Sequence, residues 1–293
     1  MLDLLGESPT IFVTVVFAIS LILGSFLNVV IYRLPIMMER DWREQCEEFA
    51  DIPASELPPG AFNLVVPRSR CPSCGKEIKA WQNIPVLSYL ALGGRCAECK
   101  EAISTRYPLV EAATALLAAV VAWRFGFGAE ALMGIVFTLM LVPITMIDFD
   151  HQLIPDSIVL PLLWIGLGLS LFHPQPGSEV LFISSREAII GAIAGYLTLW
   201  SFYWAFKLIT GKEGMGYGDF KLLAALGAWL GYSYLFTIVI MSAVVGAIIG
   251  LALIVFRGRD HKVPMPFGPF LAAAGWVTML YGDQIKELLN LPF

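Results

Sequence analysis

The chain has 293 residues, of which 57% are hydrophobic and only 15% are charged, and its formal net charge is −5. A soluble domain carries about 25% charged residues, so this composition, together with a mean hydropathy of +0.73, excludes an ordinary soluble protein. A spanning helix needs about 20 mostly apolar residues, and the chain holds several such runs. The sequence therefore predicts an all-α polytopic membrane protein.

Eight apolar segments are candidates for transmembrane helices. They lie at 11–32, 107–125, 129–147, 153–172, 187–209, 220–231, 234–256 and 270–285. The first lacks a basic n-region and a small-residue cleavage site, so we expect a spanning helix there and not a signal peptide. The sixth is short for a full span and rich in Gly and Ala, so we expect it to tilt, to pack tightly or to stop part-way.

The distribution of basic residues between the segments predicts their orientation. The connections after the first, third, fifth and seventh segments together hold 16 of the 19 Lys and Arg residues, and the opposite side holds only Arg124, Arg186 and Lys286. Cytoplasmic loops carry the excess of basic residues, so we expect the first set of connections in the cytoplasm and both termini on the periplasmic side.

One sizeable polar insertion, 34–106, interrupts the apolar pattern. Its first part, 37–50, places Trp42, Cys46 and Phe49 at helical spacing among acidic residues, which is typical of an amphipathic helix at a membrane surface. Prolines and a glycine between 53 and 60 then indicate a linker. We interpret the free-standing Cys46 as a small apolar helix residue.

Two Cys-x-x-Cys pairs form the second part of this insertion. Both pairs, Cys71 with Cys74 and Cys96 with Cys99, precede similar tails, Gly-Lys-Glu-Ile and Lys-Glu-Ala-Ile. Four thiolates can converge on one Zn²⁺ and leave no open position, so the pattern favours a structural zinc module. Redox dithiols and an iron–sulfur centre remain alternatives, whereas disulfides are disfavoured on a cytoplasmic side.

Two aspartates mark the ends of apolar segments. Asp148 closes the run 142–147, and Asp219 follows the glycine-bounded turn Gly-Tyr-Gly just before the sixth segment. Ionisable groups at membrane depth are costly and are candidates for function. Each one alone is also compatible with a helix cap or with interfacial water. As a pair on the predicted cytoplasmic side, they suggest a site in which two carboxyls share a water.

Asp150 and Asp156 are the competing partners for Asp219. Asp156 follows a proline and is compatible with a helix cap, and Asp150 lies beside His151, which we expect in a solvated loop. Asp148 follows the apolar run directly, so we expect it to be the more desolvated. Asp219 at a helix N-terminus would then be the base and Asp148 the acid of a pair that activates water against a peptide carbonyl.

The motifs extend over nearly the whole chain and resemble the bacterial type IV prepilin peptidase family. They are GSFLNVVIYRLP (24–35), CPSC with CAEC (71–99), NIPVLSYLALGGRC (83–96), RYPLVE (106–111), IDFDHQLIPD (147–156), GKEGMGYGDFKLLAALGAW (211–229) and PMPFGPFLA (264–272). The four-residue Gly-x-Gly-Asp is a weak signal by itself, but its combination with the cysteine quartet and the apolar segments is specific.

This resemblance implies a bifunctional enzyme of the inner membrane. Asp148 and Asp219 would be the catalytic pair of an aspartic peptidase of the GxGD class, which removes the short basic leader of type IV prepilins and pseudopilins at the cytoplasmic face. The new N-terminal residue would then be methylated with S-adenosylmethionine as donor. The resemblance points to Gly94 for the methyl donor, although a tight turn before Cys96 explains this glycine equally well.

We therefore expect a first transmembrane helix at 1–33, a cytoplasmic domain with amphipathic helix and zinc module at 34–106, and a transmembrane peptidase domain at 107–293. The bilayer and the prepilins are the expected partners, and we expect no nucleic acid. A proton-coupled transporter and a non-catalytic pilus assembly scaffold remain alternatives. Both aspartates at one face, and no evident inverted repeat, disfavour transport.

Overall fold

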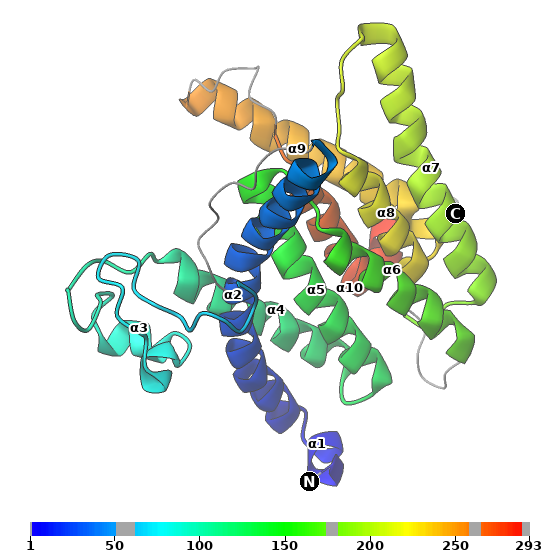
Figure 1. The fold of residues 1–293 in the computed structure, drawn as a ribbon. Coiled ribbons are helices and arrows are strands. Elements are labelled where there is room, and N and C mark those ends of the chain that lie inside the picture. The colour runs from blue at the N-terminus through cyan, green and yellow to red at the C-terminus, as the bar shows by residue number, and fades with distance from the viewer. Residues whose placement is uncertain (1, 51–61, 174–180, 258–264, 289–293) are drawn as a thin grey trace. The chain divides into compact units, whose positions relative to one another are not determined.

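The computed structural model describes residues 2–50, 62–173, 181–257 and 265–288. Within these ranges the chain is helical and has no β-strand, which confirms the predicted all-α fold. The linker predicted at 53–60 lies outside the described residues. The chain divides into two compact units, Met1–Trp123 and Arg124–Phe293, which are described separately below (Figure 1).

The first unit contains two long helices and a small irregular module. Its elements are α1 (Leu2–Glu7), α2 (Pro9–Ala50), η1 (Ala80–Asn83), α3 (Leu87–Ala91) and α4 (Arg106–Phe125), whose last two residues lie past the boundary. We expected α2 to end near residue 32 and a separate amphipathic helix to follow. Instead α2 continues through Pro35 as one helix of 42 residues. The residues after Pro35 are good helix formers, and Arg43 pairs with Glu39 one turn earlier at 3.3 Å.

The second unit is a bundle of helices. It contains α5 (Ala129–His151), α6 (Asp156–Leu169) extended by η2 (Ser170–Phe172), α7 (Ser185–Thr210), α8 (Tyr217–Leu230), η3 (Tyr232–Tyr234), α9 (Leu235–Arg257) and α10 (Gly268–Leu288). Each of the eight predicted apolar segments thus coincides with a helix. In the described part of the chain, five helices are long and apolar enough to cross a membrane: α2, α4, α5, α7 and α9 with its η3 turn.

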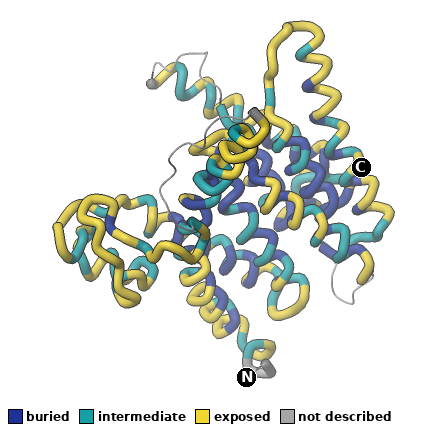
Figure 2. The backbone as a smooth tube through the Cα atoms, viewed as in Figure 1, coloured by how far each residue is buried: buried dark blue, intermediate teal, exposed yellow. Residues whose placement is uncertain are grey.

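Helix α8 forms the core of the second unit. It packs against α6, α7 and α10, and its residues from Leu222 to Leu230 are all buried (Figure 2). Fourteen residues rise only about 21 Å, which is less than the thickness of a bilayer's hydrocarbon core. The sixth predicted segment is therefore a short, tightly packed helix, as one of our three expectations stated.

Glycines allow α7 and α8 to approach at backbone distance. A Cβ atom on Gly191 of α7 would lie 2.2 Å from the carbonyl oxygen of Gly227 of α8, and a Cβ on Gly227 would lie 2.2 Å from the oxygen of Gly191. One turn along α7, a Cβ on Gly195 would lie 2.6 Å from the oxygen of Leu223. Small residues at such crossings are typical of helix packing in membranes. Backbone atoms block every added methyl group here, so a larger residue must push the helices apart.

Replacement of Gly191 by Ala should destabilise the second unit by about 1–3 kcal/mol, because the two backbones cannot yield to the new methyl group. Thermal unfolding in detergent measures this change. Gly168→Ala on α6 is the matched control, since a Cβ there has no neighbour within 4 Å. Equal melting temperatures for the two variants would contradict the packing described here.

Candidate active site and metal centre

The last full turn of α5 carries Asp148 into the interior of the second unit. The helix ends after His151, where Gln152 adopts a left-handed conformation with φ of 53° and donates its N–H to the Asp148 carbonyl at 2.9 Å. Asp148 is only 5% exposed. Its burial fits the expectation that, of the aspartates in this segment, it is the one withdrawn from water.

Asp219 lies in the first turn of α8 and is 7% exposed. The residue before it is a glycine for a steric reason: a Cβ on Gly218 would lie 2.8 Å from the Cβ of Ile154. Asp148 and Asp219 are close enough for their charges to interact. The Oδ1 atom of Asp219 is buried and has no hydrogen-bond partner among the described residues. A buried acceptor without a partner is uncommon and calls for an explanation.

A third segment, the start of α10, completes the site. The backbone N–H of Gly268 donates to Oδ2 of Asp148 at 3.0 Å. A Cβ on Gly268 would lie 2.6 Å from that oxygen and 2.9 Å from Cδ1 of Ile154. Our sequence reasoning gave neither Gly268 nor Ile154 a role at the site. The available signal was the Gly-Pro step at 268–269, which is typical of a helix start.

The hydrogen bonds favour the reverse of the expected roles of the two carboxyls. We expected Asp219 to carry the negative charge, because it lies at a helix N-terminus. Each carboxyl has one backbone N–H acting on it, that of Gly268 on Asp148 and that of Gly216 on Asp219, but Oδ1 of Asp219 is buried and receives none within the described chain. An N–H donor stabilises a carboxylate, so this arrangement favours the charge on Asp148 and the shared proton on Asp219.

The other candidate residues of this segment point away from the pair. Asp150 and His151 are exposed at the end of α5. Asp156, at the start of α6, forms an ion pair with Lys221 of α8, whose Nζ lies 2.7 and 2.8 Å from the two carboxylate oxygens. This ion pair joins the start of α6 to α8, directly after the connection 152–155 that carries Ile154.

The four predicted cysteines converge in the first unit. The Sγ atoms of Cys71, Cys74, Cys96 and Cys99 all lie within 4.8 Å of one another, and those of Cys71 and Cys99 are 3.8 Å apart. Zinc–sulfur bonds of about 2.3 Å in a tetrahedron require sulfur atoms about 3.8 Å apart, so the cluster fits a tetrahedral metal site. Cys46 is exposed on α2 and does not belong to the cluster.

Each cysteine pair lies in the same backbone turn. Cys71 donates its N–H to the carbonyl of Lys76, and Cys96 donates to that of Glu101, at 2.9 and 2.8 Å. The fifth residue of each turn, Gly75 or Lys100, is left-handed. The two turns are joined by an ion pair of 2.7 Å between Lys76 and Glu98. The predicted twin knuckles are therefore confirmed.

The backbone turns of the knuckles also change the pKa values of the thiols in a way that favours the binding of a cation. The backbone N–H groups of Cys74 and Ser73 lower the pKa of Cys71 to about 6, and those of Cys99 and Glu98 lower the pKa of Cys96. The N–H of Glu101 acts in the same direction on Cys99, but desolvation and the neighbouring thiols raise its pKa to about 12. A bound divalent cation would offset both the desolvation and the effect of the neighbouring thiols, and would allow all four cysteines to be thiolates at once.

Buried polar residues that the sequence analysis did not single out attach this module to α2 and α4. Arg33, 7% exposed, donates to the carbonyls of Asn63 and Pro67 at 2.8 and 2.6 Å. Glu111, 8% exposed, accepts the N–H of Val86 at 2.8 Å. Both residues stand in quoted motifs, yet no local pattern distinguishes them from ordinary residues at a membrane border.

Gly94 has a structural explanation. Its φ is +69°, its N–H donates to the carbonyl of Tyr89 at 2.8 Å, and a Cβ would lie 2.8 Å from the Tyr89 hydroxyl oxygen. The tight turn before Cys96 therefore requires glycine. A role in binding the methyl donor stays a prediction.

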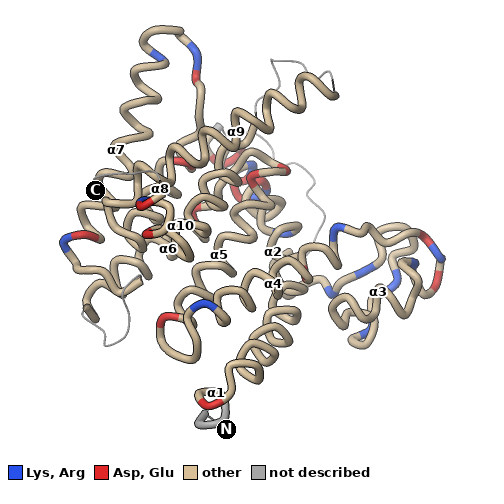
Figure 3. The backbone as a smooth tube through the Cα atoms, turned by 180° about the vertical axis from the view of Figure 1, so that it is seen from behind, with Lys and Arg blue, Asp and Glu red and all other residues tan. Residues whose placement is uncertain are grey.

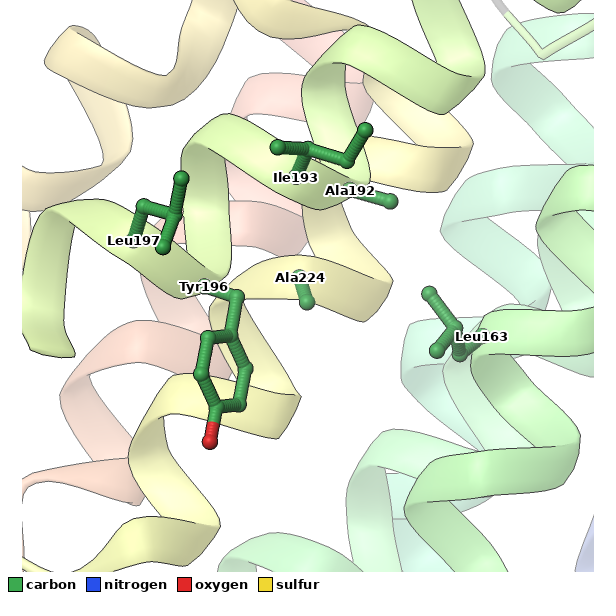
Figure 4. A pocket seen from close by; sticks show the side chains of 6 residues that line it. All are labelled: Leu163, Ala192, Ile193, Tyr196, Leu197 and Ala224. Carbon is green, nitrogen blue, oxygen red and sulfur yellow. The ribbon is translucent and has the colours of Figure 1, made fainter.

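A shallow apolar hollow of about 340 Å³ lies between α6 and α7 (Figure 4). Ala224 of α8 lies between the lining residues of these two helices, and the other lining residues are Leu163, Ala192, Ile193, Tyr196 and Leu197. Sites for polar cofactors need convergent polar groups. This lining offers one hydroxyl, so the hollow is unsuited to the charged methyl donor.

Two family models match most of the chain. Residues 18–125 match the model of the bacterial peptidase A24 N-terminal domain, and residues 135–251 match that of the type IV leader peptidase family. No solved structure gives a significant match to the chain.

Curated relatives match over almost the entire chain. A prepilin leader peptidase/N-methyltransferase of Stutzerimonas stutzeri is 53% identical over 97% of this chain and 95% of its own length. Proteins of the same name from Pseudomonas aeruginosa and Aeromonas hydrophila are 52% and 51% identical, over 98% of this chain and 96% and 97% of theirs. The chain therefore belongs to the type IV leader peptidase family, a family of aspartic peptidases.

Proposed function

We propose that this chain removes the leader peptide of type IV prepilins and pseudopilins and then methylates the new N-terminus. The observation that carries the peptidase assignment is that two buried carboxyls, Asp148 and Asp219, lie at the ends of two apolar helices close enough for their charges to interact, with one buried oxygen of Asp219 unpartnered. The names of the curated relatives support both activities.

In this mechanism the two carboxyls share one proton. Asp148, held by the N–H of Gly268, accepts a proton from water, which then attacks the scissile carbonyl. Asp219 donates its proton in a hydrogen bond to the carbonyl oxygen through the otherwise unpartnered oxygen, and later to the leaving amine. Burial keeps the pair from bulk water, so that both interactions act in a medium of low polarity.

The two proposed cofactors have separate roles. Cys71, Cys74, Cys96 and Cys99 would hold Zn²⁺, which braces the first unit and leaves no position for catalysis. S-adenosylmethionine, when bound, supplies the methyl group. We retain Gly94 as the candidate position for that site, on the resemblance alone.

We further propose an organisation into a first transmembrane helix at 1–33, a cytoplasmic domain at 34–106 and a membrane peptidase domain at 107–293. The chain would lie in the bacterial inner membrane with both termini in the periplasm and the aspartates at the cytoplasmic face, as the excess of basic residues supports. A transporter or a non-catalytic scaffold is disfavoured by membership of a peptidase family.

A direct test mixes the purified protein with a prepilin and S-adenosylmethionine in detergent. We expect a shortened pilin on a gel and one added methyl group at its new N-terminus by mass spectrometry. An intact prepilin after prolonged incubation would contradict the peptidase, and a shortened but unmethylated pilin would contradict the methyltransferase.

Replacement of either Asp148 or Asp219 by Asn should lower the rate of leader removal by about 10²- to 10⁴-fold, because each carboxyl handles a proton. Leader removal in detergent measures the rate, and membrane insertion should be unchanged. Asp150→Asn is the matched control, because Asp150 lies close to Asp148 in the chain but is exposed, and its effect should be far milder. Substantial activity in either of the first two variants would refute the assignment.

Gly268→Ala should inactivate the peptidase without unfolding it. The new methyl group would lie 2.6 Å from Oδ2 of Asp148. That oxygen belongs to a side chain, which can rotate away from the methyl group, whereas a backbone atom could not. A displaced catalytic group costs about 100-fold in rate. Gly250→Ala on α9 is the control, since its nearest neighbour is the flexible end of Met265 at 3.4 Å. Wild-type activity in Gly268→Ala would show that this contact does not set the position of Asp148.

Purified protein should contain about one zinc ion per chain, by the coordination of the four-cysteine site. Serine at Cys71, Cys74, Cys96 or Cys99 should cause its loss and loosen the first unit, because metal binding contributes to folding. Elemental analysis decides this, with Cys46→Ser as the neutral control. Iron in place of zinc, or metal content indifferent to Cys96, would count against the proposal.

A further inference from the structure

The connection between α7 and α8 folds back along the end of α7. Helix α7 ends at Gly211, which is left-handed with φ of +70°, and the residues up to Gly216 lead directly to Asp219. Glu213 in this connection forms an ion pair with Lys207 of α7, with 2.7 Å between Nζ and Oε1. Figure 3 shows charged residues of both signs where α7 meets this connection.

Lys207 has further partners on its own helix. It donates to the hydroxyl of Tyr203 at 3.1 Å, and its ammonium lies 5.4 and 5.5 Å from the ring centroids of Tyr203 and Trp204. An exposed ion pair alone is a weak constraint. Here the cation is held by a carboxylate, the Tyr203 hydroxyl and the Trp204 ring together, so its position is defined. Lys207 also lowers the pKa of Glu213, which keeps the pair ionised at neutral pH.

Tyr203 connects this cation to the residues on either side of Asp219. Its ring is buried and lies 5.4 Å from the ring centroid of Tyr217 and 5.6 Å from that of Phe220. Tyr217 and Phe220 also contact each other at 5.4 Å. The backbone at Gly218 and Asp219 therefore runs between two aromatic side chains that are both fixed on Tyr203.

We propose that Lys207 is a positioning residue of the peptidase, an inference that rests on the proposed function. By holding Glu213 and Tyr203 at once, it fixes the connection 211–216 and the aromatic contacts, and thereby places the carboxyl of Asp219 beside Asp148. Lys207 itself does not touch the reacting atoms.

Lys207→Met and Glu213→Gln should each lower kcat for leader removal by about 10- to 100-fold, with a smaller change in KM, because Asp219 is displaced while the substrate still binds. The double variant should lose no more than the worse single variant, since both changes break one anchor. Lys207→Arg should retain most of kcat. Lys212→Met is the matched control, since it removes a positive charge from the same connection without touching the anchor.

A second readout does not need peptidase activity. In Lys207→Met the connection should open more often, so trypsin should cut after Lys212 about 10-fold faster than in wild-type protein. This experiment separates failure of the anchor from failure of the proposed function. Wild-type kcat in Lys207→Met, losses that multiply in the double variant, or an unchanged trypsin rate would each overturn the proposal.

Discussion

The burial of α8 among α6, α7 and α10 is the constraint on which the site depends. A carboxyl on a helix end near lipid normally turns to water, because desolvation of a charge is expensive. Here the backbone contact between Gly191 and Gly227 brings α8 directly against α7. Asp219, in the first turn of α8, is only 7% exposed. A short helix without a full span serves this purpose, since its N-terminus is exposed at Gly216 and Tyr217 but the chain is already buried at Asp219 and Phe220.

Three further contacts shape the surroundings of the two buried carboxyls, which differ from each other. Ile154 fills the space that Gly218 and Gly268 leave open, and the ion pair of Asp156 with Lys221 lies next to the segment that carries Ile154. The N–H of Gly268 then binds Asp148, whereas the buried Oδ1 of Asp219 has no partner in the described chain. The donor to Asp148 thus comes from α10, which is remote from both carboxyls in sequence.

The sequence allowed the local features to be predicted. Long apolar runs and the absence of charge placed the helices, the spacing and matching tails of the cysteines placed the knuckles, and the position of Asp148 directly after an apolar run distinguished it from Asp150 and Asp156. The contacts between distant segments could not be predicted. Gly268, Arg33 and Glu111 act through tertiary hydrogen bonds, and the continuity of α2 through Pro35 outweighs the usual effect of proline in a helix. The roles of the two carboxyls were inferred from helix ends alone, and the hydrogen bond from α10 favours the reverse.

The central claim is that Asp148 and Asp219 act as one unit on a shared proton. Residual leader removal in Asp148→Asn, Asp219→Asn and the double variant, compared under single-turnover conditions, tests it most directly. If the two carboxyls form one catalytic device, the three residual rates will be nearly equal, because loss of either member already removes the whole contribution. A double variant whose loss is the product of the two single losses would show that the carboxyls act independently and would contradict the account.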